Sequence, residues 1–168
     1  MAADAHAGGL SARVVDALRS AGLSVGTAES CTGGLVCAAL TDVAGSSEVV
    51  RGGVVSYAVA VKERVLGVAA TITRDTSIGV VSAPCAEAMA RGARHVLDAD
   101  LAVSTTGIAG PGGAEPGKPV GTVWFGVSSK LGERSDVCRF EGDRARVRSQ
   151  AVEHALRLVL DEVERLEA

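Results

Sequence analysis

The chain has 168 residues, of which 47% are hydrophobic and only 2% are aromatic. This length suits one domain, whose core has to be built mainly from Ala, Val, Leu and Ile side chains. The net charge of −3 argues against a nucleic-acid-binding protein, which normally carries a basic face. No apolar stretch is long enough to span a bilayer, and the first residues do not resemble a signal peptide. These features predict a cytoplasmic protein without a membrane anchor.

The cysteines and histidines show no disulfide or metal-ligand pattern. No two of the four cysteines form a CxxC pair, and a disulfide framework is not expected in a chain with so many apolar residues. His6, His95 and His154 are far apart in the sequence, at no ligand spacing. We therefore expect no metal site, no cofactor and no histidine-based triad.

Hydrophobic periodicity predicts alternating helices and strands. The small, polar residues 1–8 are expected to form a loose tail, and residues 9–168 a single domain. Apolar residues at helical spacing predict a helix over 10–19, which Gly22 ends. The segments predicted next are strand 23–28, helix 35–43, strand 52–59, helix 61–68, an irregular stretch 69–83, helix 84–99 and strand 101–107.

The last third of the chain predicts a hairpin and a helix. Residues 120–129 and 134–140 are typical of two antiparallel strands. Asp143 is expected to cap the final helix, and Ser82 to cap the helix that begins at Pro84. Strands that alternate with helices, followed by one hairpin, predict a three-layer α/β/α domain with a mixed sheet.

Two glycine-rich segments, 30–34 and 107–113, follow predicted strands. Ligands of open α/β sheets bind at the carboxyl ends of the strands, so both segments should lie at one edge of the fold. Neither fits the dinucleotide-binding fingerprint or the Walker A pattern. Small residues in the second segment would let backbone amides approach an anionic substrate. An irregular connection without a binding role is the alternative.

Ser30 is the candidate nucleophile, because it lies between a buried strand and a helix. A side chain there is exposed to substrate, and the backbone N–H groups that follow can bind an oxyanion. The local pattern alone favours a different interpretation, in which Ser30 or Thr32 caps the helix. Cys31 is expected to be a small packing residue, since nothing indicates a lowered pKa.

A nucleophilic serine needs a base, and no histidine is placed to serve. Lys62 follows the second predicted strand, and Tyr57, the only tyrosine, precedes it by five residues. A buried lysine with a lowered pKa can deprotonate a serine, and a tyrosine hydroxyl can orient or relay the proton. The alternatives are a solvated lysine on a helix surface and a half-buried strand tyrosine whose hydroxyl meets water.

Arg144 and Arg148 share one face of the final predicted helix. At this i, i+4 spacing they could bind a phosphate, or they could pair with Glu141 and its neighbours on a solvated surface.

From about residue 10 to 165, the order and spacing of these motifs resemble the CinA C-terminal domain family, also called the PncC family. The segments that carry the resemblance are Ala28–Gly34 (AESCTGG), Tyr57 with Lys62, Thr106–Pro111 (TGIAGP), Lys118–Trp124 (KPVGTVW), and Phe140–Arg144 with Val147 and Arg148. The chain departs from the family pattern at Ala58–Val61, where the family usually carries a polar segment. It departs again at Ala83, where the family usually has Glu.

The resemblance implies an amidohydrolase that converts nicotinamide mononucleotide into nicotinic acid mononucleotide and ammonia, in pyridine-nucleotide recycling. Family members resemble serine amidases with a Ser-Lys pair assisted by Tyr, which correspond here to Ser30, Lys62 and Tyr57. Amides at the helix entry would hold the oxyanion. The substrate-binding positions implied are Thr32, Gly33, Gly34, Thr106, Gly107, Ala109, Gly110, Arg144 and Arg148. The family fold implies a mixed, five-stranded sheet, and the chain is expected to be the stand-alone form.

Other functions stay open from the sequence. One is a catalytically weak CinA-like domain that binds a nucleotide or a protein partner, linked to competence or DNA damage. Another is an amidase for a related amide or a different nucleotide. We also expect a homo-oligomer, with the Val-rich segment 58–61 as a candidate interface.

Overall fold

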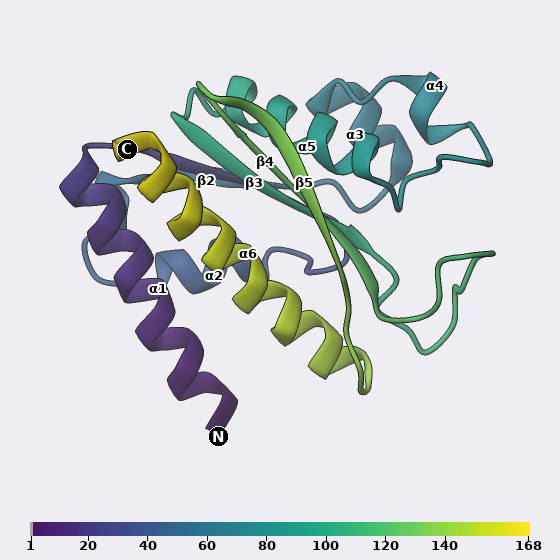
Figure 1. Cartoon of the computed structure of the whole chain (residues 1–168), viewed down its shortest axis with the longest axis horizontal. Coiled ribbons are helices and arrows are strands. Elements are labelled where there is room, and N and C mark those ends of the chain that lie inside the picture. Colours follow the sequence, from purple (N-terminus) through teal and green to yellow (C-terminus); the bar gives the residue numbers. More distant parts are fainter. Residues whose placement is uncertain (1) are drawn as a thin grey trace.

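Figure 1 shows the computed structural model, which describes the backbone of residues 2–168 and the side chains of residues 9–168. Five strands form one sheet in the order β2-β1-β3-β4-β5. They are β1 (Val25–Glu29), β2 (Val50–Val55), β3 (Leu101–Gly107), β4 (Thr122–Ser129) and β5 (Gly132–Arg139). The first three strands run parallel, β4 pairs antiparallel with β3, and β5 pairs antiparallel with β4. The mixed, five-stranded sheet is therefore confirmed.

Helices cover both faces of the sheet, which makes the fold the predicted three-layer α/β/α arrangement (Figure 1). One layer contains α1 (Ala2–Ala21), α2 (Leu35–Thr41) and α6 (Arg144–Glu167). The other contains α3 (Val59–Leu66), α4 (Ala70–Thr73) and α5 (Ala83–Val96), of which α5 packs directly on the strands. A short 3₁₀ turn, Ser46–Glu48, precedes β2.

Each helical layer encloses its own apolar core. Leu18, Phe125 and Leu156 belong to the larger core, under α1 and α6, and Leu66 and Met89 to the smaller one, under α5. Each of these side chains is at most 3% exposed, which stabilises the fold by roughly 1.5–3 kcal/mol per large apolar group. Aliphatic side chains supply most of both cores, as the composition predicts.

Two glycines let α5 approach its neighbours closely. A Cβ at Gly126 would lie 2.1 Å from the Ala86 carbonyl oxygen, so a side chain there would push α5 off β4. A Cβ at Gly92 would lie 2.0 Å from the carbonyl oxygen of Leu66, the last residue of α3. Close packing at these two points fixes α3, which carries Lys62, against the sheet.

Most of the predicted elements are confirmed within a few residues, and so are the two helix caps. Ser82 Oγ accepts a hydrogen bond from Cys85 N, and Asp143 Oδ1 accepts one from Arg146 N. The prediction of an irregular stretch over 69–83 is wrong in part, because α4 forms within it. The backbone of residues 2–8 forms the first turns of α1, so the loose tail predicted for residues 1–8 is not confirmed.

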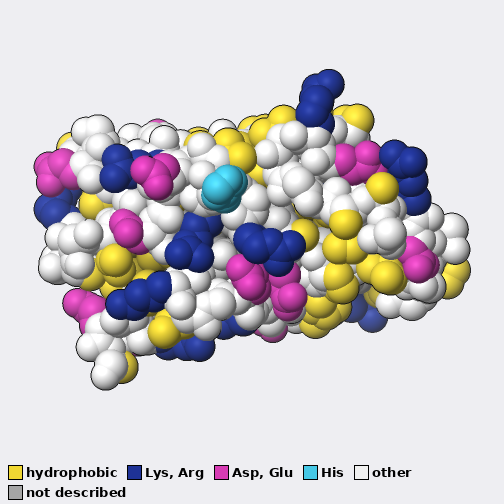
Figure 2. Space-filling view, turned by 90° about the horizontal axis from the view of Figure 1, so that it is seen from above, with side chains coloured by type: hydrophobic (Ala, Val, Ile, Leu, Met, Phe, Trp, Pro, Cys, Tyr) yellow, Lys and Arg dark blue, Asp and Glu magenta, His cyan; other side chains and the backbone are white. Residues whose placement is uncertain are grey.

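The surface mixes charges of both signs. On the face drawn in Figure 2, Lys and Arg side chains are interspersed with Asp and Glu, and hydrophobic side chains gather toward the right of the view. Within the described part of the chain, no helix combines the length and the apolar character needed to cross a membrane.

Candidate active site at the carboxyl ends of the parallel strands

The residues that follow β1 and β2 remain hydrogen-bonded to the neighbouring strand. Ser30 N donates to Thr105 O at 2.9 Å, and Ser56 N donates to Glu29 O at 2.8 Å. β2 pairs with one edge of β1, and β3 pairs with the opposite edge. The strand order therefore reverses direction at β1. In open α/β sheets such a switch point opens a crevice where ligands bind. Ser30 therefore lies where the topology predicts a site.

Ser30 and Lys62 form a hydrogen-bonded pair. Lys62 is the fourth residue of α3 and is only 1% exposed, so the alternative of a solvated surface lysine is wrong. Its Nζ lies 2.9 Å from Ser30 Oγ and also contacts the carbonyl oxygens of Ser56, at 2.5 Å, and Tyr57, at 3.5 Å. The fold thus brings together two side chains that are 32 residues apart in the sequence.

The surroundings of Lys62 favour the neutral amine. Burial lowers its pKa from the ordinary value of 10.5, and the nearby thiols of Cys85 and Cys31 oppose this shift. Its hydrogen-bond partners are a hydroxyl and two carbonyl oxygens, and no carboxylate in the described part of the chain pairs with it. A neutral amine can donate two N–H groups to the carbonyls while its lone pair accepts the Ser30 proton.

Cys31 is not a rival nucleophile, as the sequence predicts. Its side chain is 6% exposed, and burial raises the pKa of its thiol to about 11. A thiol with this pKa is almost entirely protonated at neutral pH, and the thiolate is the reactive form.

Glu29, the last residue of β1, organises the turn that carries Ser30. It is 1% exposed, and its two carboxylate oxygens accept five hydrogen bonds. The donors are the hydroxyls of Thr27 (3.2 Å) and Thr32 (2.7 Å) and the backbone N–H groups of Gly34 (2.9 Å), Val36 (3.0 Å) and Cys37 (2.8 Å). Sequence reasoning missed this residue, although an acidic residue between a buried strand and a glycine-rich helix entry was a usable signal.

The Glu29 contacts correct two expectations. The N-cap of α2 is Gly34, with no side-chain cap, so capping by Ser30 or Thr32 is wrong. The helix-entry amides donate to Glu29 and not to an oxyanion site. Among the hydrogen bonds of the described residues, the N–H groups of Cys31 and Thr32 have no acceptor. These two amides are therefore the better candidates for binding an oxyanion beside Ser30.

Exchanging Glu29 for glutamine should destabilise the protein. The Glu29→Gln side chain would present an NH₂ group to N–H and O–H donors and lose the charge that strengthens these bonds. We expect the free energy of unfolding to fall by about 3 kcal/mol, measured by urea denaturation. The control is Glu153→Gln on the surface of α6, where a change below about 0.5 kcal/mol is expected. If both substitutions lowered the free energy of unfolding by the same amount, the role of Glu29 in holding the turn would be contradicted.

Thr32, Gly33 and Gly34 shape the turn. The Thr32 side chain is fully buried, and its Oγ1 lies 2.7 Å from that of Thr105, which the sequence analysis did not single out. Gly33 and Gly34 have φ values of +64° and +99°, which strain any residue with a Cβ. The three residues therefore determine the conformation of the turn, and the Thr32 hydroxyl is buried between Glu29 and Thr105.

The Tyr57 hydroxyl does not belong to the Ser30–Lys62 pair. Tyr57 lies beyond the end of β2 and is 63% exposed, so it is not a half-buried strand residue. Its Oη accepts a hydrogen bond from Arg144 Nη2 at 3.2 Å, and only its backbone carbonyl contacts Lys62. The structure therefore does not place this hydroxyl where it could relay a proton between Ser30 and Lys62.

The two arginines of α6 bind the loops around the site. Arg144 Nη1 donates to Gly110 O at 2.9 Å. Arg148 donates from Nε to Cys31 O at 3.1 Å and from Nη2 to Thr32 O at 2.9 Å. The alternative pairing with Glu141 is not found among the described ion pairs. Both guanidinium groups therefore lie beside the candidate site without a carboxylate partner.

Only part of the second glycine-rich segment, residues 107–113, contacts the residues around the candidate site. The buried Thr106 hydroxyl donates to Val80 O at 2.7 Å, so it ties the chain before α5 to the sheet. A Cβ at Gly107 would lie 2.6 Å from Thr122 O, so glycine is required there by the adjacent strand. Ala109 is 5% exposed and belongs to the core. These contacts give Thr106, Gly107 and Ala109 structural roles, and Gly110 lies beside Arg144; substrate contacts at these positions stay a prediction.

The two departures from the family pattern lie at helix starts. Ala58 is the N-cap of α3 without a side-chain cap, and most of the 58–61 segment is exposed. Ala83 begins α5, which Ser82 caps. The hydrogen-bond partners of Lys62 Nζ are Ser30, Ser56 and Tyr57, and none of them belongs to either departure.

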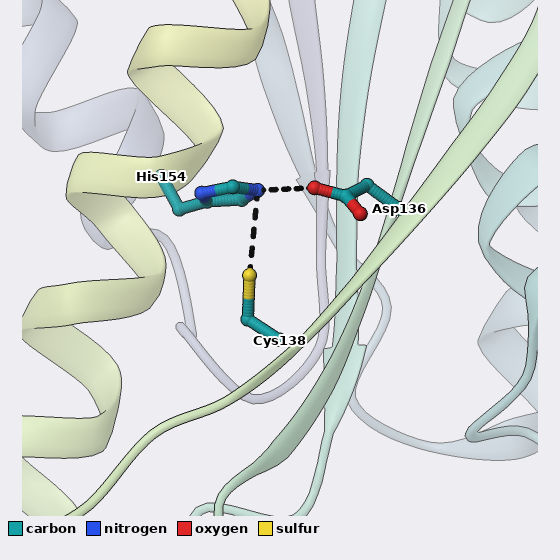
Figure 3. Close-up of side chains that lie close together, drawn as sticks. All are labelled: Asp136, Cys138 and His154. Atoms are coloured by element: carbon teal, nitrogen blue, oxygen red, sulfur yellow. Dashed lines mark hydrogen bonds and ion pairs between the residues drawn. The ribbon is translucent and has the colours of Figure 1, made fainter.

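A second group of polar side chains lies elsewhere, between β5 and α6 (Figure 3). Asp136, Cys138 and His154 each offer one ligand atom, and these atoms lie within 4.8 Å of one another. The structure brings together possible ligands that the sequence pattern does not group, and the expectation of no metal site stays a prediction. The sequence pattern missed this group because His154 lies 16 residues beyond Cys138, on a different element.

A family model described as the CinA C-terminal domain matches residues 8–163. A "Nicotinamide-nucleotide amidohydrolase PncC" from Enterobacter agglomerans is 45% identical over 91% of this chain and 93% of its own. A "CinA-like protein" from Geobacter sulfurreducens is 48% identical over 82% of this chain and 33% of its own. The chain spans about a third of the length of this and the other CinA-like relatives.

Solved structures agree with the sequence comparisons. A CinA superfamily protein from Klebsiella pneumoniae has a TM-score of 0.89 at 36% identity, covering 95% of this chain and 98% of the other. A competence/damage inducible protein from Agrobacterium tumefaciens has a TM-score of 0.88 at 39% identity, covering 92% of this chain and 94% of the other.

Proposed function

The chain belongs to the CinA C-terminal domain family, and from this premise we propose that it hydrolyses the carboxamide of nicotinamide mononucleotide to nicotinic acid mononucleotide and ammonia. The name of the PncC relative, which matches over nearly its whole length, supports the substrate. The observation that carries the proposal is the 2.9 Å contact between Ser30 Oγ and the buried Lys62 Nζ. A serine next to a neutral amine is a nucleophile with its base in place.

In the proposed first step, Ser30 Oγ attacks the carboxamide carbon while Lys62 Nζ takes the hydroxyl proton. The N–H groups of Cys31 and Thr32 would stabilise the negative oxygen of the tetrahedral intermediate. Protonated Lys62 then gives its proton to the leaving nitrogen, the C–N bond breaks and ammonia departs. Water, deprotonated by Lys62, hydrolyses the ester on Ser30, which restores the hydroxyl and releases the carboxylate product.

The charge around the site supports an anionic substrate. Arg144 and Arg148 donate to backbone carbonyls, so their positive charges are free to attract a phosphate. Exposed apolar groups flank the same region: Tyr57 is 63% exposed and Val55 50%, and Val55 lies beside Gly34. We propose that the arginines bind the phosphate and that this apolar surface receives the pyridine ring.

The test is ammonia release from nicotinamide mononucleotide by the purified protein, with chromatography of the product. We expect equal amounts of ammonia and nicotinic acid mononucleotide. The matched substrate is nicotinamide riboside, which lacks the phosphate, and kcat/KM for it should be roughly 10- to 100-fold lower.

No ammonia from the folded protein would contradict the proposed activity. If that protein still bound the mononucleotide, the alternative of a nucleotide-binding domain would replace it. Equal kcat/KM for the two substrates would instead remove the phosphate-binding role of the arginines.

A further inference from the structure

The cluster of Asp136, Cys138 and His154 lies outside the proposed active site. Asp136 and Cys138 are two residues apart on β5, so both side chains extend from the same face of the strand. His154 reaches them from the middle of α6 (Figure 3). Its Nε2 is 2.8 Å from Asp136 Oδ2 and 3.5 Å from Cys138 Sγ.

The arrangement is not that of a catalytic triad. In a triad the histidine uses one ring nitrogen for the nucleophile and the other for the carboxylate. Here both contacts meet the same nitrogen, Nε2. The three ligand atoms lie within 4.8 Å of one another, close enough for one ion to contact all three.

The spacing fits a tetrahedral metal ion. Zinc bonds of about 2.3 Å to sulfur and about 2.0 Å to nitrogen at a tetrahedral angle place these atoms about 3.5 Å apart. The observed separation of Nε2 and Sγ is 3.5 Å. Nitrogen and oxygen ligands of zinc lie about 3.3 Å apart, so the Asp136 carboxylate would have to move outward by about 0.5 Å. Asp136 can do so, since its side chain is 46% exposed.

The neighbouring residues hold the ligands in position. The His154 ring packs against Phe125, with centroids 4.6 Å apart, and near Phe140, at 6.4 Å. Val137 N donates to Asp136 Oδ1 at 2.8 Å, which leaves Oδ2 directed at the cluster. A site whose ligands are fixed in this way loses little conformational entropy when an ion binds.

We propose that Asp136, Cys138 and His154 form a binding site for Zn²⁺ or a similar thiolate-preferring divalent cation, with water as the fourth ligand. Carboxylate, thiolate and imidazole together suit zinc and not magnesium or calcium, which prefer oxygen alone. The ion would join the edge strand β5 to α6, the helix whose first turns carry Arg144 and Arg148. This role is separate from the proposed amidase reaction, which uses no metal.

The experiment uses the full chain, freed of metal with a chelator and kept reduced. Calorimetry with Zn²⁺ is expected to show a stoichiometry near one. Titration with Co²⁺ should produce a thiolate-to-cobalt charge-transfer band. Excess Zn²⁺, at about a hundredfold over Kd, should raise Tm by roughly 5 °C or more.

Variants decide whether this cluster is the site. Cys138→Ser should abolish the cobalt band and the rise in Tm, and His154→Gln should weaken Zn²⁺ binding at least about tenfold. The matched control is Cys37→Ser, which removes another partly exposed free cysteine and should leave both signals unchanged. Circular dichroism checks that each variant is folded.

The absence of Zn²⁺ binding and of a cobalt band in the wild-type chain would overturn the proposal. A band that persists in both Cys138→Ser and His154→Gln, or is lost in Cys37→Ser, would overturn it as well. Neither result depends on amidase activity, so the two proposals fail independently.

Discussion

The Ser30→Ala protein is expected to lose at least about a thousandfold in kcat/KM for nicotinamide mononucleotide, because it lacks the hydroxyl that would form the acyl intermediate. Cys31 cannot replace Ser30, since burial raises the pKa of its thiol to about 11. The substitution removes one hydrogen bond, from Lys62 Nζ, so the fold should persist. Ammonia release, measured beside thermal unfolding of the same samples, checks both statements.

The matched control is Ser149→Ala, which removes an exposed serine of α6 whose hydroxyl bonds only to Arg146 O. Its kcat/KM should equal that of the wild type. If Ser30→Ala retained most of the activity while folded, the nucleophile would have to be sought elsewhere in the crevice.

Lys62→Met is expected to reduce kcat as severely as Ser30→Ala, because the variant has no base to accept the serine proton. The two residues act as a unit, so the double variant should be no less active than either single variant. Lys130→Met, in the exposed hairpin turn, is the control and should keep full activity. An additive loss in the double variant would contradict the pairing.

The pH dependence gives a second measurement of Lys62. Below its lowered pKa the amine is protonated and has no lone pair, so wild-type kcat/KM should rise with pH through a value below 10.5. The folded state also binds fewer protons at Lys62 than the unfolded state between the lowered pKa and 10.5. Lys62 should therefore make the free energy of unfolding increase as pH rises through this window. Lys62→Met should lack that contribution. If the free energy of unfolding had the same slope against pH in the wild type and in Lys62→Met, a lowered pKa of Lys62 would be contradicted.

The residue pattern predicted the three layers and the mixed sheet, whereas the family resemblance implied the five strands and the pairing of Ser30 with Lys62. Ser30 directly follows β1 and Lys62 lies in the first turn of the helix after β2, and the carboxyl ends of parallel strands share one edge. The orientation of Tyr57 could not be predicted in the same way. Its hydroxyl turns toward Arg144, 87 residues away, and that contact depends on how α6 packs against the loops.

Glu29 and the Asp136–Cys138–His154 cluster were missed for related reasons. Three donors to Glu29 are backbone N–H groups, which every non-proline residue carries, so the side-chain types do not reveal them. They lie in and just after a turn in which Gly33 and Gly34 are in left-handed conformation. The cluster joins a strand to a helix, so its members have no fixed spacing in sequence. The cluster depends on tertiary packing, whereas the Glu29 contacts are local but are made mostly to backbone N–H groups, which motif reasoning does not consider.

The five hydrogen bonds accepted by Glu29 also determine when the turn that carries Ser30 becomes ordered. They fix the turn that carries Ser30 in the ligand-free protein, so the entropy of ordering this turn is lost during folding. A substrate then meets a nucleophile that is already oriented, and its binding energy is not consumed in arranging the loop. The proposed reaction consequently needs no ordering of this turn when the substrate binds.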